Sequence, residues 1–152
     1  MKKKLLLTTI CLVAIFLLTA CGKKPVSIED FKKAAEAKNM TVVDVVDQFA
    51  DSPQIKTANV ALIENKWQLE HYTLTSEKEA KEMFENNKDR FEAEENDTTL
   101  KTTVEMEHYQ KYVLETADKY KVLIRAEDMF IYGNVPNEYK SDAKALLKDL
   151  GY

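Results

Sequence analysis

Two strand-like runs joined by a short turn and followed by a helix start constrain what this chain can fold into more than any other feature. The runs span residues 58–63 and 67–74, and the turn between them spans residues 64–66. Polar and apolar side chains alternate along most of the second run, as in a strand with one buried face. Ser76 and Glu79 have the spacing of a capping box, which predicts a helix directly after this hairpin.

The second half of the chain repeats this order. Strand-like residues occur through Val104 and 112–114, then at 120–126 and 129–135, and we expect a final helix after Pro136 with Asn137 as its cap. A shift of 62 positions places similar residues on one another: Val42 on Val104, Val60 on Val122, Leu62 on Ile124, Trp67 on Met129, Leu69 on Ile131 and Phe84 on Leu146. The chain therefore contains either two duplicated strand-strand-strand-helix units or two hairpin-helix units that align by chance.

Two further elements precede the hairpin. Ser27 opens a second capping box, which predicts a helix to about Lys38 that ends at Asn39. Residues 41–46 are rich in β-branched side chains and favour a strand, although their apolar spacing also fits a short helix. Together these elements predict an α+β fold, with an antiparallel sheet of about six strands and its helices on one face.

The first twenty residues differ in composition from the rest of the chain. Lysines at positions 2–4 precede an apolar run over residues 5–18, and small residues follow it. A basic start, an apolar run and a small-residue exit are the parts of a secretory signal. The run has 14 residues, fewer than the roughly 17–25 that a transmembrane helix requires. We therefore expect an exported precursor with a cleaved signal.

Leu18-Thr19-Ala20-Cys21 ends this segment and resembles the lipobox of bacterial lipoproteins. The resemblance implies that Cys21 receives a diacylglyceryl group and that the chain is cut before it. It divides the chain into a signal peptide (1–20), a lipidated cysteine with a short tether (21–26) and a single extracytoplasmic domain (27–152). The expected location is the cell membrane, where two or more acyl chains give a stable anchor.

Most of the exported domain also resembles small uncharacterised lipoproteins of Gram-positive bacteria. The segments that carry this resemblance are residues 76–80, 84–88 and 147–152. This resemblance implies no particular activity. The tether 22–26 spans under roughly 20 Å when extended, so we expect the domain to work close to the membrane surface.

Cysteine content and charge exclude several classes of function. Cys11 lies in the signal and Cys21 carries the lipid, so the mature domain has neither a disulfide nor a thiol nucleophile. Loss of the three signal lysines changes the formal charge from −4 to −7, and an acidic protein is a poor partner for nucleic acid. We expect a monomer without a cofactor, whose partners are the membrane and an envelope protein, peptide or glycan.

Two histidines are the side chains best suited to acid–base or metal chemistry. His71 shares a strand face with apolar residues, which indicates a partly buried, hydrogen-bonded structural role. His108 follows Glu105 and Glu107, but on a strand it would point away from both carboxylates. Zinc sites require three or four convergent ligands, and we therefore expect no metal site here.

The remaining polar and aromatic residues leave the function open. The acidic segment 92–97 lacks the residue order of a calcium loop, so we expect a solvated loop. Tyr109, Tyr112 and Tyr120 either form an exposed platform for peptides or sugars or pack under the helices. We expect a non-enzymatic binding or structural module at the membrane. The alternative is an envelope hydrolase or a metal-dependent enzyme that uses His71 or His108 with carboxylates.

Overall fold

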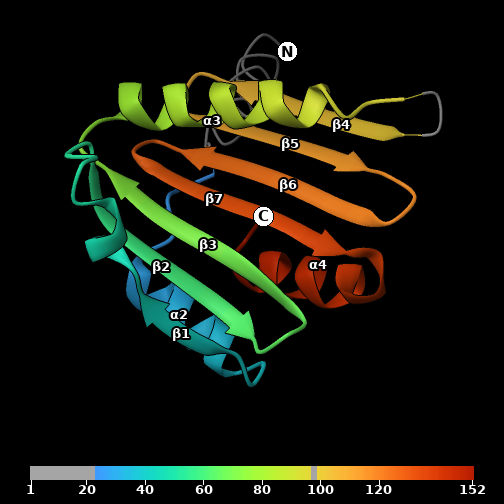
Figure 1. The fold of residues 1–152 in the computed structure, drawn as a ribbon. Coiled ribbons are helices and arrows are strands. Elements are labelled where there is room, and N and C mark those ends of the chain that lie inside the picture. The colour runs from blue at the N-terminus through green and yellow to red at the C-terminus, as the bar shows by residue number, and fades with distance from the viewer. Residues whose placement is uncertain (1–22, 97–98) are drawn as a thin grey trace, which may run out of the picture.

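A computed structural model describes residues 23–96 and 99–152, which form one seven-stranded antiparallel sheet with three α-helices (Figure 1). The strands are β1 (Thr41–Asp44), β2 (Ile55–Ile63), β3 (Trp67–Leu74), β4 (Leu100–Met106), β5 (Tyr109–Glu115), β6 (Lys119–Ala126) and β7 (Met129–Pro136). The helices are α2 (Ile28–Glu36), α3 (Glu77–Glu92) and α4 (Lys140–Asp149). The strand order is β1-β2-β3-β7-β6-β5-β4.

The α+β class is confirmed, but the sheet has one strand more than expected. The region through Val104 and residues 112–114 forms two strands, because a turn at Glu107 and His108 folds β5 back onto β4. Residues 41–46 divide between the two structures that their sequence allows. The strand β1 ends at Asp44, and a 3₁₀ turn follows at Val46–Phe49.

Side chains at the expected positions begin two of the helices and end one of them. The hydroxyl oxygen of Ser27 accepts from the amide of Asp30 at 3.1 Å, and that of Ser76 accepts from the amide of Glu79 at 3.2 Å. Asn39 follows α2 with a φ of 59°, the left-handed conformation that asparagine tolerates better than most residues. The two predicted helix starts and the stop at Asn39 are therefore confirmed.

The predicted cap at Asn137 is wrong. Its side-chain amide donates instead to the carbonyl oxygens of Thr116 and Ala117, each at 3.0 Å. A 3₁₀ turn at Asn137–Tyr139 precedes α4, which begins without a side-chain cap. Asn137 therefore fixes the β5–β6 turn rather than the start of the helix.

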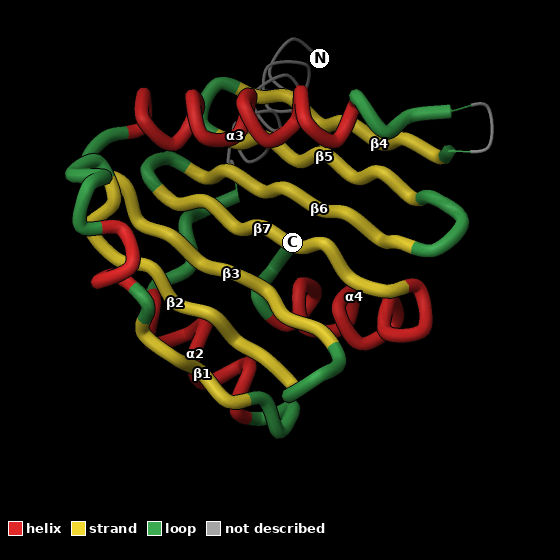
Figure 2. The backbone as a smooth tube through the Cα atoms, in the orientation of Figure 1, coloured by secondary structure: helices red, strands yellow, loops and turns green. Residues whose placement is uncertain are grey.

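The helices cover both faces of the sheet rather than one. Helix α3 packs on one face, whereas α2 and α4 pack on the other (Figures 1 and 2). The central strands bury side chains in both directions; residues 120–126 of β6 are all buried. A sheet that is apolar on both faces must be covered on both, and this excludes the expected one-sided arrangement.

The two strand-strand-strand-helix units are not related by a single two-fold axis. Strands β3 and β7 pair with Glu70 directly opposite Tyr132, as a two-fold between the hairpins would require. The strand order, however, places β1 beside β2 and β4 outside β5, so Val42 and Val104 do not correspond in space. Because α3 and α4 also lie on opposite faces, the structure does not support duplication of the whole unit.

Candidate functional site

His71 has the structural role that its strand position indicates. Its side chain is fully buried, Nε2 lies 3.0 Å from the carbonyl oxygen of Val26, and the ring lies 5.0 Å from that of Phe31. Burial lowers the pKa of the imidazole below its ordinary value of 6.5. A neutral imidazole with Nε2–H donating to Val26 satisfies this site, while Nδ1 has no hydrogen-bond partner among the described residues.

The hydrogen bond between His71 and Val26 helps to attach the segment before α2 to the domain. The Tyr152 hydroxyl donates to the carbonyl oxygen of Lys24 at 2.6 Å, and the Lys23 ammonium donates to that of Gly151 at 2.5 Å. Residues 23–26 are therefore held against the C-terminus rather than forming a free tether. Cys21, the predicted lipid attachment site, lies outside the described residues.

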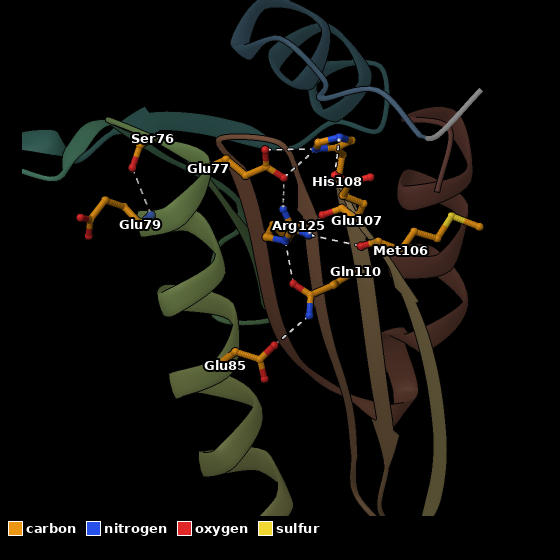
Figure 3. A network of polar contacts seen from close by, with 9 residues as sticks. All are labelled: Ser76, Glu77, Glu79, Glu85, Met106, Glu107, His108, Gln110 and Arg125. Carbon is orange, nitrogen blue, oxygen red and sulfur yellow. Dashed lines mark hydrogen bonds and ion pairs between the residues drawn. The ribbon is translucent and has the colours of Figure 1, made fainter. Parts of the chain in front are cut away.

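A buried arginine organises the polar network around His108 (Figure 3). Arg125 on β6 is 1% exposed. Its guanidinium donates to Gln110 Oε1 at 2.6 Å, to Glu77 Oε1 at 2.7 Å and to the carbonyl oxygen of Glu107 at 2.8 Å. Gln110 in turn donates to Glu85 Oε1 at 2.8 Å. These bonds compensate the burial of the arginine charge and connect α3 to the β4–β5 turn.

Glu77 and His108 form the exposed side of this network. His108 lies in the β4–β5 turn rather than mid-strand, and its Nδ1 is 3.0 Å from Glu77 Oε1. The hydrogen bond from Arg125, followed by that from His108, lowers the pKa of the Glu77 carboxyl. The same carboxylate raises the pKa of His108. A protonated His108 therefore adds a second cation to Glu77 at the start of α3.

The hydrogen bonds of this network connect α3 to β6 and to the β4–β5 turn. Arg125 directs its donors at protein acceptors, and the Glu77 carboxylate is shared between Arg125 and His108. Five hollows on the described part of the chain are lined by other residues. Within residues 23–96 and 99–152, no group of three or more His, Cys, Asp or Glu side chains could hold a metal ion.

The three tyrosines and the acidic segment also have packing roles. Tyr109, Tyr112 and Tyr120 are each at most 5% exposed, so the packing alternative holds and the exposed platform is excluded. Glu94 forms an ion pair with the buried Lys121, which also lies over the ring of Phe91. The expected solvated loop is thus attached to the sheet at Glu94.

The candidate site is instead an open groove on the face that carries α3. A hollow of about 590 Å³ lies between the β2–β3 turn and β7, and a second of about 360 Å³ lies between β3, β7, α3 and the 3₁₀ turn. Both hollows are lined by Glu70 and Tyr132. We call this surface the Glu70 groove; its defining residues are Phe49, Gln68, Glu70, Tyr72, Arg90 and Tyr132.

A carboxylate held between donors occupies the middle of the groove. Tyr72 donates to Glu70 Oε2 at 2.5 Å, and Gln68 donates to Glu70 Oε1 at 2.9 Å. The three residues lie on one face of β3, because they are spaced by two positions. Burial, followed by the hydrogen bond to Glu70, raises the pKa of the Tyr72 hydroxyl far above its ordinary value. Tyr72 therefore remains a neutral donor, and Glu70 is held in one orientation.

Aromatic rings and polar side-chain groups surround the Glu70 carboxylate. The ring of Tyr72 meets that of Phe49 edge to face at 5.7 Å, and Tyr132 packs against Phe91 at 5.4 Å. Further amide and cationic side chains line the two hollows: Lys66, Asn87, Arg90, Lys119 and Asn134. The groove thus combines aromatic surface with hydrogen-bonding groups, the composition typical of sites that bind polar chains.

No family model, curated protein or solved structure matches the chain. No helix in the described part of the chain is long and apolar enough to cross a membrane.

No local feature of the sequence predicts the Glu70 groove. The alternation along residues 67–74 places Gln68, Glu70 and Tyr72 on one face of a strand, but their position beside β7 depends on a pairing between strands far apart in the sequence. The alternation of amide, carboxylate and phenol along that face was the only local signal. The hydrogen bond between Glu77 and Arg125 was also not predicted, because the two residues lie 48 positions apart in the sequence.

Proposed function

We propose that this protein is a lipid-anchored, extracytoplasmic binding module that holds an extended peptide segment in the Glu70 groove. The oriented carboxylate of Glu70, flanked by aromatic rings in an open groove, is the observation that carries the proposal. Its oxygens accept hydrogen bonds from peptide N–H groups or from a cationic side chain. The neighbouring amides both donate and accept, as a peptide backbone requires.

The attached N-terminal segment supports a position close to the membrane. If Cys21 carries the lipid, only the residues between it and Lys23 separate the anchor from a part of the chain bound to Gly151. The domain would then have a restricted orientation on the outer face of the cytoplasmic membrane. A groove in a fixed position is suited to capturing a segment of another envelope protein.

The enzymatic alternative receives less support from the geometry. His71 uses Nε2 to hold Val26 and is fully buried, so it does not reach a substrate. His108 is accessible, with its side chain 60% exposed, but its carboxylate partner is engaged by Arg125. A general base requires both access to substrate and a free acceptor.

Selection from a phage-displayed library of random-sequence peptides on the full chain tests the proposal. Glu70→Gln removes the charge and Tyr132→Ala removes aromatic surface, and each should weaken the selected peptides about tenfold or more, a change of roughly 1.4 kcal/mol. Glu29→Gln is the matched control, because Glu29 is exposed on α2 at the opposite face. This control should bind as the parent chain does.

Two results would contradict the proposal. Failure to select any binding peptide would exclude the peptide class of ligand. Peptides that bind Glu70→Gln and Tyr132→Ala as tightly as the parent chain would place the site elsewhere. Thermal midpoints of all variants should be compared first, so that a loss of binding is not caused by unfolding.

A further inference from the structure

Strand β4 forms one edge of the sheet and is the more accessible of the two edges. In the part of the chain that the structure describes, β4 pairs only with β5, and β1 at the opposite edge pairs only with β2. β1 has four residues and is followed by a 3₁₀ turn, whereas β4 has seven residues. Leu100 and Met106 at the ends of β4 are 69% and 59% exposed. Accessible apolar edge strands are sites where further strands pair.

The hydrogen-bonding pattern determines which residues of β4 direct their backbone outward. Glu127 donates from its amide to the carbonyl oxygen of His108 at 2.9 Å, so even-numbered residues of β5 bond to β6. Odd-numbered residues of β5 therefore bond to β4, whose even-numbered residues they face. It follows that the amides and carbonyls of Lys101, Thr103 and Glu105 point away from the sheet.

We propose that two copies of this chain associate through β4, antiparallel, about a two-fold axis at Thr103. This pairing places Thr103 opposite its own copy, and the other opposed residues are Leu100 with Met106, Lys101 with Glu105, and Thr102 with Val104. The three outward-facing residues then exchange backbone hydrogen bonds across the axis. The result is one continuous sheet through both protomers, in place of the monomer expected from the sequence.

The side chains of β4 match one another in this register. Lys101 and Glu105 are the charged residues of the strand, and charged residues on an edge normally oppose pairing. Here each charge faces its opposite, an arrangement that stabilises antiparallel pairs. The exposed side chains of Leu100 and Met106 meet on the other face of the strand. Only the register centred on Thr103 pairs all seven residues.

Neighbouring charges extend this complementarity beyond the strand. Lys101 already contacts Glu95 Oε1 at 3.0 Å, and Glu105 contacts Lys88 at 3.3 Å. Glu92 also lies 4.0 Å from Lys101, and Glu85 lies 4.0 Å from Lys88, so each lysine is shared between two acids. The two-fold brings Lys101 of one copy to Glu105 of the other, and opposite charges therefore face each other across the axis.

Disulfide trapping of the full chain in membranes tests the two-fold position. A Thr103→Cys variant places two thiols across a hydrogen-bonded pair with Cα atoms about 5.5 Å apart, within the range of disulfides. Mild oxidation should give a covalent dimer. Thr41→Cys is the matched control, because Thr41 is an exposed threonine on the other edge strand. This control and the parent chain should remain largely monomeric.

Charge exchange tests the register. In the Thr103→Cys background, Lys101→Glu places two acids opposite each other and Glu105→Lys places two bases opposite each other. Each variant alone should form on the order of fivefold less disulfide dimer. A mixture of the two, distinguished by tags of different size, should form the mixed dimer at parental yield, because every opposed pair is again complementary.

The mixed sample separates the interface from effects within one protomer. Lys101→Glu alters the contact with Glu95 within its own protomer, and Glu105→Lys alters the contact with Lys88. These effects are the same whether the second protomer carries the same substitution or the opposite one. Equal dimer yield for Thr103→Cys and Thr41→Cys, or no preference for the mixed dimer, would overturn the proposal. Because a single strand pair is smaller than a standard protein interface, trapping is a more sensitive readout than size measurement.

Discussion

Phe84 and Leu146 occupy matching positions of the two hairpin-helix units, yet they are buried on opposite faces of one sheet. Phe84 on α3 belongs to a core with Tyr112, Leu123 and Phe130. Leu146 on α4 belongs to the core on the other face. Both side chains are fully buried. The sheet therefore has two separate apolar cores, one for each side.

Truncation of either residue should destabilise the domain strongly. Phe84→Ala and Leu146→Ala each leave a cavity in a closed core and should reduce the free energy of unfolding by about 2–5 kcal/mol. Because the two cores lie on opposite faces, the effects should add to within about 0.5 kcal/mol in the double variant. Urea denaturation measures all three. Lys78→Ala, exposed on α3, should be nearly neutral.

Acidification should weaken the domain through His71. Its folded pKa is lowered, so its contribution is complete above the unfolded value near 6.5 and is lost as the pH falls towards the folded pKa. His71→Gln removes this titration while keeping an amide donor for Val26. The variant should therefore lose less stability than the parent chain between pH 7.5 and pH 5.

His108→Gln is the matched control for that measurement. The pKa of His108 is raised by Glu77, so its contribution is complete below 6.5 and is lost as the pH rises through the folded value. Removal of His108 should thus change the pH profile in the opposite sense. Identical thermal midpoints for the parent chain and His71→Gln at both pH values would contradict the prediction for His71.

Removal of the Glu77 carboxylate should leave the buried Arg125 charge short of an anionic partner. Glu77→Gln should cost about 1–3 kcal/mol of unfolding free energy, at the lower end because Glu77 is partly exposed. Adding Arg125→Met should recover part of the loss, since an apolar replacement needs no partner. If the double variant is no more stable than Glu77→Gln alone, the loss of stability does not come from an unpaired Arg125 charge.

The contribution of Glu77 to the stability of the domain should also be lost at low pH. The lowered pKa of this carboxyl means that its contribution is present above the unfolded value of about 4.5 and is lost as the pH falls through the folded value. The difference in stability between the parent chain and Glu77→Gln should therefore be greatest near neutral pH. It should shrink below about pH 4, as measured by thermal melting across a pH series.

Substitution of Cys21 tests the expected anchor. If this residue carries the lipid, Cys21→Ala should yield an uncleaved or soluble species in fractionated cells, because a single thiol is the attachment point that the lipobox resemblance implies. Metabolic labelling with a radioactive fatty acid should mark the parent chain alone. Recovery of the variant's processed domain in washed membranes would contradict the prediction.

Local signals in the sequence determined most of the elements. Alternating residues in β3 predicted its two faces, and the Ser27 and Ser76 caps placed two helices correctly, because these effects act over a few residues. The same alternation predicted partial burial of His71, whose side chain is fully buried in the structure. Asn137 shows the limit: a residue able to cap a helix bonded to a turn twenty residues away instead.

Tertiary structure alone decided the strand order, the faces covered by the helices and the composition of both polar sites. The pairing of β3 with β7 places Glu70 opposite Tyr132. The residues around either position in the sequence do not indicate this contact. The placement of α3 and α4 on opposite faces followed from a sheet that buries side chains in both directions. Alternation along a strand defines which residues share a face, but only packing between distant segments determines what covers that face.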